Sequence, residues 1–183
     1  TQEHLQDAAD YGRCFIKLGS PASYIPELAR VNKYQLGACI VNLDGTVMEC
    51  GDTRTRFTIQ SISKLASLIL AISDKGSDYL FHDKVGVEPT GDPFNSIVKL
   101  ETKTKPFNPF INAGAITVAD CIEGNSSEEK FERFLSFVRK LCGDEEISLN
   151  EAVYLSEKAT GDRNRALAYY LKASGILEGN VEE

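Results

Sequence analysis

Two kinds of hydrophobic and polar patterning follow one another in the first third of the chain. Residues 4–18 carry apolar side chains at helical spacing, and Gly19 stands where a helix would stop. Residues 36–41 are then rich in β-forming side chains, the tight-turn dipeptide Asp44-Gly45 follows, and residues 46–48 start a returning strand. The pattern predicts a helix and an antiparallel β-hairpin, which needs a packed helix or further strands to be stable.

The period changes at Ser61 and stays helical over most of the remaining sequence. The segment from Ser61 to the stop signal at Gly76 is apolar over most of its surface, so we expect a largely buried helix. Residues 85–112 hold several prolines and glycines and predict ordered loops. The order predicts an α+β fold with one early hairpin and a mostly helical lobe. Further helices are predicted for residues 113–122, from Ser127 to just before Gly143, and for residues 149–158 and 163–174.

The charge balance narrows the classes of partner. The 183 residues carry 20 basic and 27 acidic side chains, a formal net charge of -7, and 42% of them are hydrophobic. This is the composition of a soluble globular domain, and the negative charge argues against binding nucleic acid or an anionic membrane surface. No apolar run is long enough to span a bilayer, and no basic-then-apolar leader is present. We therefore expect neither a nucleic-acid nor a membrane partner.

The five cysteines are expected to be free thiols in a reducing compartment. Their number is odd, no two are at Cys-x-x-Cys spacing, and they lie in apolar stretches typical of core positions. Only two histidines, His4 and His82, accompany them, which argues against a zinc site. The sequence thus predicts a cytoplasmic protein without a metal centre. The cysteines are Cys14, Cys39, Cys50, Cys121 and Cys142.

Ser61 and Lys64 are the first candidates for chemistry. A serine hydroxyl becomes a good nucleophile only when a base removes its proton, and residues three apart on a helix share one face. Apolar surroundings lower the pKa of a lysine, so Lys64 can serve as this base. The backbone N–H groups at the start of the helix, including that of Ser61, can stabilise an oxyanion. A simpler interpretation is that Ser61 only caps the helix.

The Ser-x-x-Lys spacing is weakly specific, since the chain contains it three times. The other copies begin at Ser96 and Ser127, and the latter is typical of a capped, solvated first turn of a helix. Only the copy at Ser61 leads into an apolar helix, where a lysine on the inner face is costly unless it has a role. We therefore select the Ser61 copy as the candidate.

Further positions are candidates for substrate binding. Asn112 precedes a run of small residues that allows close approach to the backbone, although local grounds favour its interpretation as a cap of the following helix. Glu157 and Asn164 are predicted to flank a turn at Gly161. A carboxylate together with amides suits a zwitterionic amino acid, because the carboxylate binds its ammonium group and the amides bind its polar ends. On local grounds Glu157 can also be a surface charge, and Tyr24 a packing residue.

Taken together, these segments resemble the serine-dependent glutaminases, whose fold is similar to that of the β-lactamases and penicillin-binding proteins. The matching stretches follow the family order over most of the chain. Several are long and unusual, which makes the set far more specific than Ser-x-x-Lys alone. The stretches are residues 24–29 (YIPELA), 60–64 (QSISK), 85–96 (VGVEPTGDPFNS), 108–116 (NPFINAGAI) and 156–164 (SEKATGDRN).

The resemblance implies hydrolysis of L-glutamine to L-glutamate and ammonia, with no cofactor and no metal. It implies that Ser61 is the nucleophile that forms a γ-glutamyl ester, that Lys64 is its base, and that Tyr24 is an active-site phenol near this pair. It also implies a homo-oligomer for the full-length protein. The residues that it assigns to substrate binding are Gln60, Ser61, Asn112, Glu157 and Asn164.

Members of this family are longer than the present chain. We therefore expect residues 1–183 to be the N-terminal part of one glutaminase domain, with residues 1–60 in a lobe of helix and hairpin and residues 61–183 in a mainly helical lobe. The later strands of the sheet, two substrate-site tyrosines and a Lys-Ser-Gly-type strand are missing, so we expect little activity from this chain alone. Two other classes stay open. One is a β-lactam-recognising acyl-serine protein, against which the missing Ser-Asp-Asn and Lys-Thr-Gly motifs argue, and the other is a non-catalytic interaction module.

Overall fold

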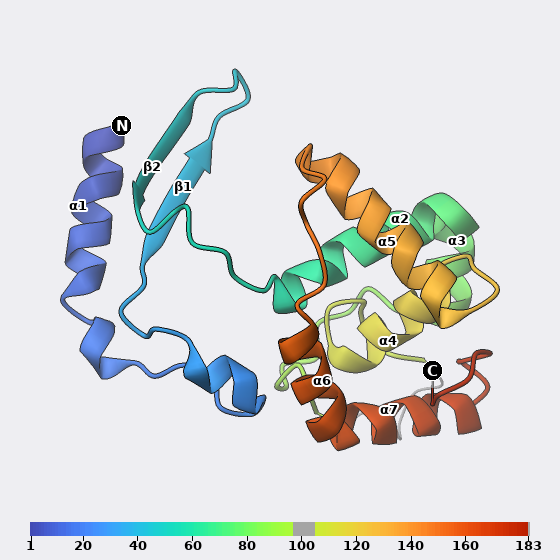
Figure 1. Cartoon of the computed structure of the whole chain (residues 1–183). Helices are drawn as coiled ribbons and strands as arrows, with labels where there is room; N and C mark the ends of the chain where they lie inside the picture. The colour runs from blue at the N-terminus through green and yellow to red at the C-terminus, as the bar shows by residue number, and fades with distance from the viewer. Residues whose placement is uncertain (97–104, 183) are drawn as a thin grey trace. The chain divides into compact units, whose positions relative to one another are not determined.

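The computed structural model describes residues 1–96 and 105–182, and the chain forms two compact units. Unit 1 contains Thr1–Thr58 and Asn150–Thr160, and unit 2 contains Ile59–Leu149 and Gly161–Glu183. Each unit has its own secondary structure and is described by itself below (Figure 1).

Unit 1 begins with helix α1 (Gln2–Arg13), which packs along an antiparallel pair of strands, β1 (Gly37–Val41) and β2 (Val47–Gly51) (Figure 1). The register pairs the first residue of β1 with the last residue of β2. The turn between the strands contains Gly45 at a φ of +83°, a conformation that favours glycine. The predicted hairpin is confirmed, and α1 supplies the packing that two strands lack on their own.

Helix α1 is shorter than the predicted segment of residues 4–18. The Cys14 N–H donates to the Tyr11 carbonyl at 3.1 Å, and this three-residue spacing tightens the last turn and ends the α-helical ladder. Ile16–Leu18 then form a separate 3-10 turn, η1. Apolar spacing continues through both pieces, which is why it did not reveal the break.

The rest of unit 1 joins two segments that are distant in sequence. The 3-10 helix η2 (Pro26–Arg30) packs against α6 (Glu151–Thr160), and the Glu27 N–H donates to the Ser156 hydroxyl at 3.2 Å. Ile25, directly before η2, is only 2% exposed. These contacts fix the segment 24–29 against the helix that carries Glu157.

Unit 2 is helical throughout its regular secondary structure, over the part that the structure describes. The elements, in order, are η3 (Gln60–Ile62), α2 (Ser63–Lys75), α3 (Ser77–Tyr79), a π-helical turn η4 (Leu80–Lys84), α4 (Asn112–Asp120), α5 (Ser127–Cys142) and α7 (Asp162–Ala173). Helix α2 contacts both α4 and α5, and α4 contacts α7 (Figure 1).

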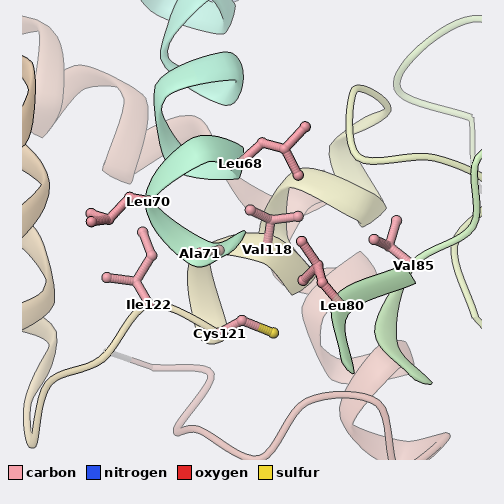
Figure 2. Packing of buried hydrophobic residues seen from close by; sticks show 8 residues of the cluster. All are labelled: Leu68, Leu70, Ala71, Leu80, Val85, Val118, Cys121 and Ile122. Atoms are coloured by element: carbon pink, nitrogen blue, oxygen red, sulfur yellow. The ribbon is translucent and has the colours of Figure 1, made fainter. Parts of the chain in front are cut away.

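Two clusters of buried side chains hold unit 2 together. Figure 2 shows the first, in which Val118 of α4 lies between Leu68 and Ala71 of α2 and Leu80 of η4. The second cluster joins α4 to α7 and includes Leu167 and other residues that are almost fully buried. Because α4 belongs to both clusters, its first residue is held firmly relative to α2 and α7. The members of the second cluster are Ala113, Leu167, Leu171, Ile176 and Leu177.

The helices predicted for unit 2 are confirmed, with differences at their ends. The α-helical part of α2 begins at Ser63, because Ser61 lies in the preceding 3-10 turn. Helix α5 is capped by the Ser126 hydroxyl, which accepts the Glu129 N–H at 3.2 Å, and Gly143 ends it in the left-handed region. The segment of residues 85–112 forms loops up to the start of α4, apart from residues 97–104, which lie outside the described ranges.

The prediction of a largely buried α2 is wrong for one face of the helix. Leu68, Leu70 and Ala71 are buried, but Ile62 is 65% exposed and Leu65 is 54% exposed. Helix α2 carries apolar side chains around most of its own surface. Within unit 2, however, α4 and α5 cover only one side of it. The Ser-x-x-Lys copy at Ser127 lies in the first turn of α5, and the copy at Ser96 extends into residues outside the described ranges.

All five cysteines are free thiols, but their burial differs. Cys50 and Cys121 are buried as expected, and burial raises the pKa of the Cys121 thiol to about 11. Cys14, Cys39 and Cys142 are exposed, so the prediction of core positions is wrong for these three. The three exposed thiols lie at two helix ends and on the hairpin.

Among the described residues, no helix combines the length and the hydropathy needed to cross a membrane.

Candidate active site

Lys64 occupies the second position of α2 and points its ammonium group at two neutral acceptors. Nζ lies 2.9 Å from the carbonyl oxygen of Phe110 and 2.8 Å from Oδ1 of Asn112. It also lies 5.5 Å from the centroid of the Phe94 ring. The side chain is half-buried, and this burial lowers the pKa of Lys64 because it disfavours the charged form. The Lys64 ammonium is therefore easier to deprotonate than that of a fully solvated lysine.

Asn112 connects Lys64 to a third helix. Its Oδ1 accepts from Lys64, and its Nδ2 donates to Oδ1 of Asn164 on α7 at 3.0 Å. The ammonium form of a lysine can only donate, so the amide oxygen of Asn112 faces Lys64 and the amide nitrogen faces Asn164. The interpretation of Asn112 as a helix cap is wrong, because Ile111 is the N-cap and the Asn112 side chain makes no capping bond. Lys64, Asn112 and Asn164 thus form one hydrogen-bonded row across α2, α4 and α7.

Ser61 lies one turn before Lys64, in the 3-10 turn η3, and its side chain is exposed. Within the described residues, no hydrogen bond joins its hydroxyl to Lys64. Catalytic hydrogen bonds are often loose in proteins without substrate and tighten when the substrate binds. The hydroxyl is therefore accessible and lies three positions before a lysine whose amine is already oriented by two hydrogen bonds.

The backbone directly before Ser61 is strained. Gln60 has a φ of +42°, and among the described residues it is the one non-glycine with a positive φ. A side chain in this region costs on the order of 1–3 kcal/mol, and such strain clusters at functional sites. The sequence contains no signal for this conformation, since glutamine rarely adopts it.

Tyr24 and Glu157 belong to unit 1, whereas Lys64, Asn112 and Asn164 belong to unit 2. Tyr24 precedes η2 and is 66% exposed, while Glu157 is exposed on α6. Helix α6 ends at Thr160 and α7 begins at Asp162, so the predicted break of the helix at Gly161 is confirmed.

Sequence reasoning missed two contributors to the surroundings of Lys64. Phe110 acts through its backbone carbonyl, for which side-chain chemistry gives no signal, and Phe94 acts through its ring. Phe94 lies in the motif of residues 85–96 and Phe110 in the motif of residues 108–116. Their aromatic character was readable from the sequence, but their proximity to Lys64 depends on the course of two loops.

A cleft of unit 2 is lined by charged side chains that stabilise the fold. It has a volume of about 910 Å³ and contains none of the predicted site residues. Its basic and acidic side chains pair with one another, as in Lys84, whose Nζ lies 2.7 Å from Glu178 and 3.0 Å from the Ile176 carbonyl. Burial disfavours the Lys84 ammonium, but the hydrogen bonds to Glu178 and Tyr79 outweigh this effect and raise its pKa. Among the described residues, no three His, Cys, Asp or Glu side chains gather to hold a metal ion.

The arrangement of a helical unit and a small antiparallel hairpin defines a protein of the β-lactamase-like fold class. A Bacillus glutaminase of known structure superposes on the whole chain with a TM-score of 0.88 and 44% identity, and the chain covers 57% of it. The glutaminase family model matches residues 19–183. The chain belongs to the glutaminase family.

Two further relatives show the extent of this similarity. Glutaminase 2 of Clostridium perfringens is 56% identical over 181 residues, which cover 98% of this chain and 59% of that protein. The Bacillus subtilis glutaminase YbgJ has been solved as a covalent complex with 5-oxo-L-norleucine, formed by reaction with 6-diazo-5-oxo-L-norleucine. It is 40% identical with a TM-score of 0.82 over 98% of this chain and 56% of its own. The present chain therefore spans little more than half the length of these relatives.

Proposed function

We propose that the protein hydrolyses L-glutamine to L-glutamate and ammonia through an acyl-serine intermediate on Ser61. Membership of the glutaminase family supports the reaction. The observation that carries the proposal is the half-buried Lys64, whose Nζ lies within 3 Å of two neutral acceptors, at 2.9 and 2.8 Å. This environment suits a general base, because burial favours the neutral amine and neither acceptor adds a negative charge.

The two hydrogen bonds of Lys64 orient the lone pair of its neutral amine. A neutral amine has two N–H bonds and one lone pair. If the Phe110 carbonyl and Asn112 Oδ1 accept the two N–H groups, the lone pair is left for a third partner. The proposed partner is the proton of the Ser61 hydroxyl, one helical turn away.

The proposed reaction has two stages. In the first, the Ser61 oxygen bonds to the side-chain amide carbon of glutamine while its proton passes to Lys64. Lys64 then delivers this proton to the leaving nitrogen, the C–N bond breaks and ammonia departs. In the second stage, water attacks the γ-glutamyl ester, Lys64 takes a proton from the water, and the Ser61 oxygen leaves and regains a proton. Glutamate is released and the enzyme returns to its starting state.

The row of amides supports a role in binding the substrate. The Oδ1 of Asn164 accepts from Asn112, so the Nδ2 of Asn164 is directed to a different partner, and we assign it to a polar end of glutamine. The strained turn at Gln60 orients the backbone that leads into Ser61. The assignment of Tyr24 as an active-site phenol and of Glu157 as a binding carboxylate rests on the family resemblance.

The proposal also covers the extent of the domain, the need for cofactors, the location and the assembly of the protein. Residues 1–183 form the N-terminal part of one glutaminase domain, with a lobe boundary near residue 60, and the protein requires no metal and no cofactor. A cytoplasmic location is supported by five free cysteines, and a homo-oligomer is expected from the family. Because this chain covers 59% of a relative such as glutaminase 2 of Clostridium perfringens, we expect its own activity to be low.

Ammonia release from glutamine tests the proposed function. The 183-residue chain should release ammonia slowly, and Ser61→Ala should abolish this release. Ser67→Ala is a matched control, since Ser67 lies on α2 and its hydroxyl donates to the Ser63 carbonyl at 3.0 Å. An equal rate from the Ser61→Ala variant would overturn the role of Ser61.

A further inference from the structure

The two acceptors of Lys64 lie where a loop leads into α4, and this loop is joined to a preceding loop through their backbones. The Gly86 N–H donates to the Pro106 carbonyl at 2.8 Å, and the Glu88 N–H donates to the Phe107 carbonyl at 2.9 Å. These bonds run between the segment before residue 97 and the segment after residue 104. The second loop then leads through Phe110 to the start of α4.

Asn108 holds the turn in this second loop. Its Oδ1 accepts from the N–H of Phe110 at 3.0 Å and from the N–H of Ile111 at 3.2 Å. Its Nδ2 donates to the carbonyl of Glu88 at 2.9 Å. Asparagine commonly closes turns in this way, and here one side-chain amide accepts two of the bonds and donates the third. The side chain therefore fixes the peptide unit next to the carbonyl that Lys64 contacts.

The same turn packs closely against α4. A Cβ placed on Gly114 would overlap the backbone oxygen of Asn108, so the helix approaches the turn closely only because residue 114 is a glycine. Ala113 and Gly114 are buried at this contact. The turn is consequently constrained on three sides, by Glu88, by α4 and by its own Asx bonds.

We infer that Asn108 is a positioning residue, which holds the Phe110 carbonyl against Lys64 and thereby sets the direction of the Lys64 amine. The hydrogen bonds of the Asn108 side chain go to Glu88, Phe110 and Ile111, so Asn108 acts on Lys64 through the backbone at Phe110. The inference rests on the proposed role of Lys64 as the base for Ser61. It assigns a function to a residue in the motif of residues 108–116 that the proposed mechanism leaves unused.

Loss of the Asn108 amide has a defined consequence. Without it, the N–H groups of Phe110 and Ile111 turn to water and the Phe110 carbonyl is no longer fixed. Lys64 then keeps the Asn112 acceptor and gains water in place of the carbonyl. Because burial is what lowers the pKa of Lys64, hydration of its amine should raise this pKa toward that of an ordinary lysine.

The test compares variants of the 183-residue chain by NMR titration of lysine labelled at the ε carbon. The signal of Lys64 is identified by its loss in Lys64→Met. Asn108→Ala should shift the Lys64 midpoint upward, and Asn108→Ser should restore part of the difference, because a serine hydroxyl closes the same turn more weakly. Asn32→Ala is the matched control. Asn32 accepts the Tyr34 N–H at 3.1 Å in a similar turn of unit 1, and its loss should leave Lys64 unchanged.

A second readout follows the modification of Ser61 by 6-diazo-5-oxo-L-norleucine. At neutral pH the rate should fall by about 10-fold to 100-fold in Asn108→Ala and recover in part at higher pH. An Asn108→Ala protein with native circular dichroism and an unchanged Lys64 midpoint would overturn the inference, and Asn108→Ser decides it if the alanine variant fails to fold. A wild-type chain that the reagent does not modify would overturn the role of Ser61, while the titration still decides the role of Asn108.

Discussion

The side-chain oxygen of Asn112 lies 2.8 Å from Nζ of Lys64, although 48 positions separate the two residues in the sequence. The contact exists because α4 packs against α2 through the cluster around Val118 and begins its first turn beside the first turn of α2. It orients the Asn112 amide, since only the oxygen can accept from a lysine. The same contact directs the other end of the amide to Asn164.

Replacing Lys64 by methionine should remove the proposed base. Methionine keeps the length and the apolar stem of lysine but carries no lone pair that can accept the serine proton at this position. We expect the rate of Ser61 acylation to fall by about 10²–10⁴, the usual contribution of general acid–base catalysis. Lys75→Met is the control on the same helix, because Lys75 pairs with Glu123 at 3.4 Å and should leave the rate unchanged. A comparable loss in both variants would indicate a general effect on α2.

The pH dependence of the reaction should report the neutral amine of Lys64. Because burial lowers its pKa, the rate should rise with pH through a midpoint below that of an ordinary lysine. In Asn112→Asp a carboxylate replaces the amide oxygen beside the ammonium and favours the charged form. The rising limb of the kcat/KM profile should therefore move to higher pH in this variant. A limb that stays in place or moves to lower pH would show that Lys64 is not the titrating group.

The sequence was informative wherever one segment determined its own structure. Apolar spacing located α2, α5 and α7, and the Asp44-Gly45 dipeptide located the hairpin turn. The motif of residues 60–64 identified Ser61 and Lys64 as candidates. The pairing of Lys64 with Asn112 was not predictable from spacing, because it depends on how α4 packs against α2.

The failures of prediction also have physical causes. Asparagine commonly caps helices, so the local sequence favoured Asn112 as a cap. In the structure its side-chain oxygen instead accepts a hydrogen bond from Lys64, which is distant in sequence. The positive φ of Gln60 and the role of the Phe110 carbonyl are backbone properties, which side-chain patterns do not encode. The exposed face of α2 carries apolar residues, so burial could not be inferred from composition alone.

The close approach of α4 to the Asn108 turn predicts an unusual response to alanine. Gly114→Ala should destabilise the protein by about 1–3 kcal/mol or more, because the added Cβ overlaps the Asn108 carbonyl oxygen. Gly12→Ala in α1 should instead stabilise it by about 0.5–1 kcal/mol. There the Cβ meets only Leu36 Cδ2 at an ordinary 3.5 Å, and alanine is the better helix former. Urea unfolding of both variants measures the difference. The same sign at both positions would contradict the packing described here.

Leu80 should be a strong determinant of the stability of unit 2. Its side chain is 0% exposed and lies in the cluster between α2, η4 and α4 (Figure 2). Leu80→Ala should lower the free energy of unfolding by about 2–5 kcal/mol through lost transfer energy and a residual cavity. Leu43→Ala, at a fully exposed position of the hairpin turn, should change it by less than about 0.5 kcal/mol. Equal effects at the two positions would show that the cluster is not the core of unit 2.

Covalent modification of Ser61 tests the central claim most directly. The chain is incubated with 6-diazo-5-oxo-L-norleucine, and the adduct is located by intact mass and peptide mapping, with Ser61→Ala and Lys64→Met in parallel. We predict an adduct of one reagent molecule less dinitrogen on Ser61 of the wild-type chain, none on Ser61→Ala, and strongly slowed formation on Lys64→Met. An adduct that persists in Ser61→Ala, or one that forms at the wild-type rate without Lys64, would contradict the proposed pair of nucleophile and base.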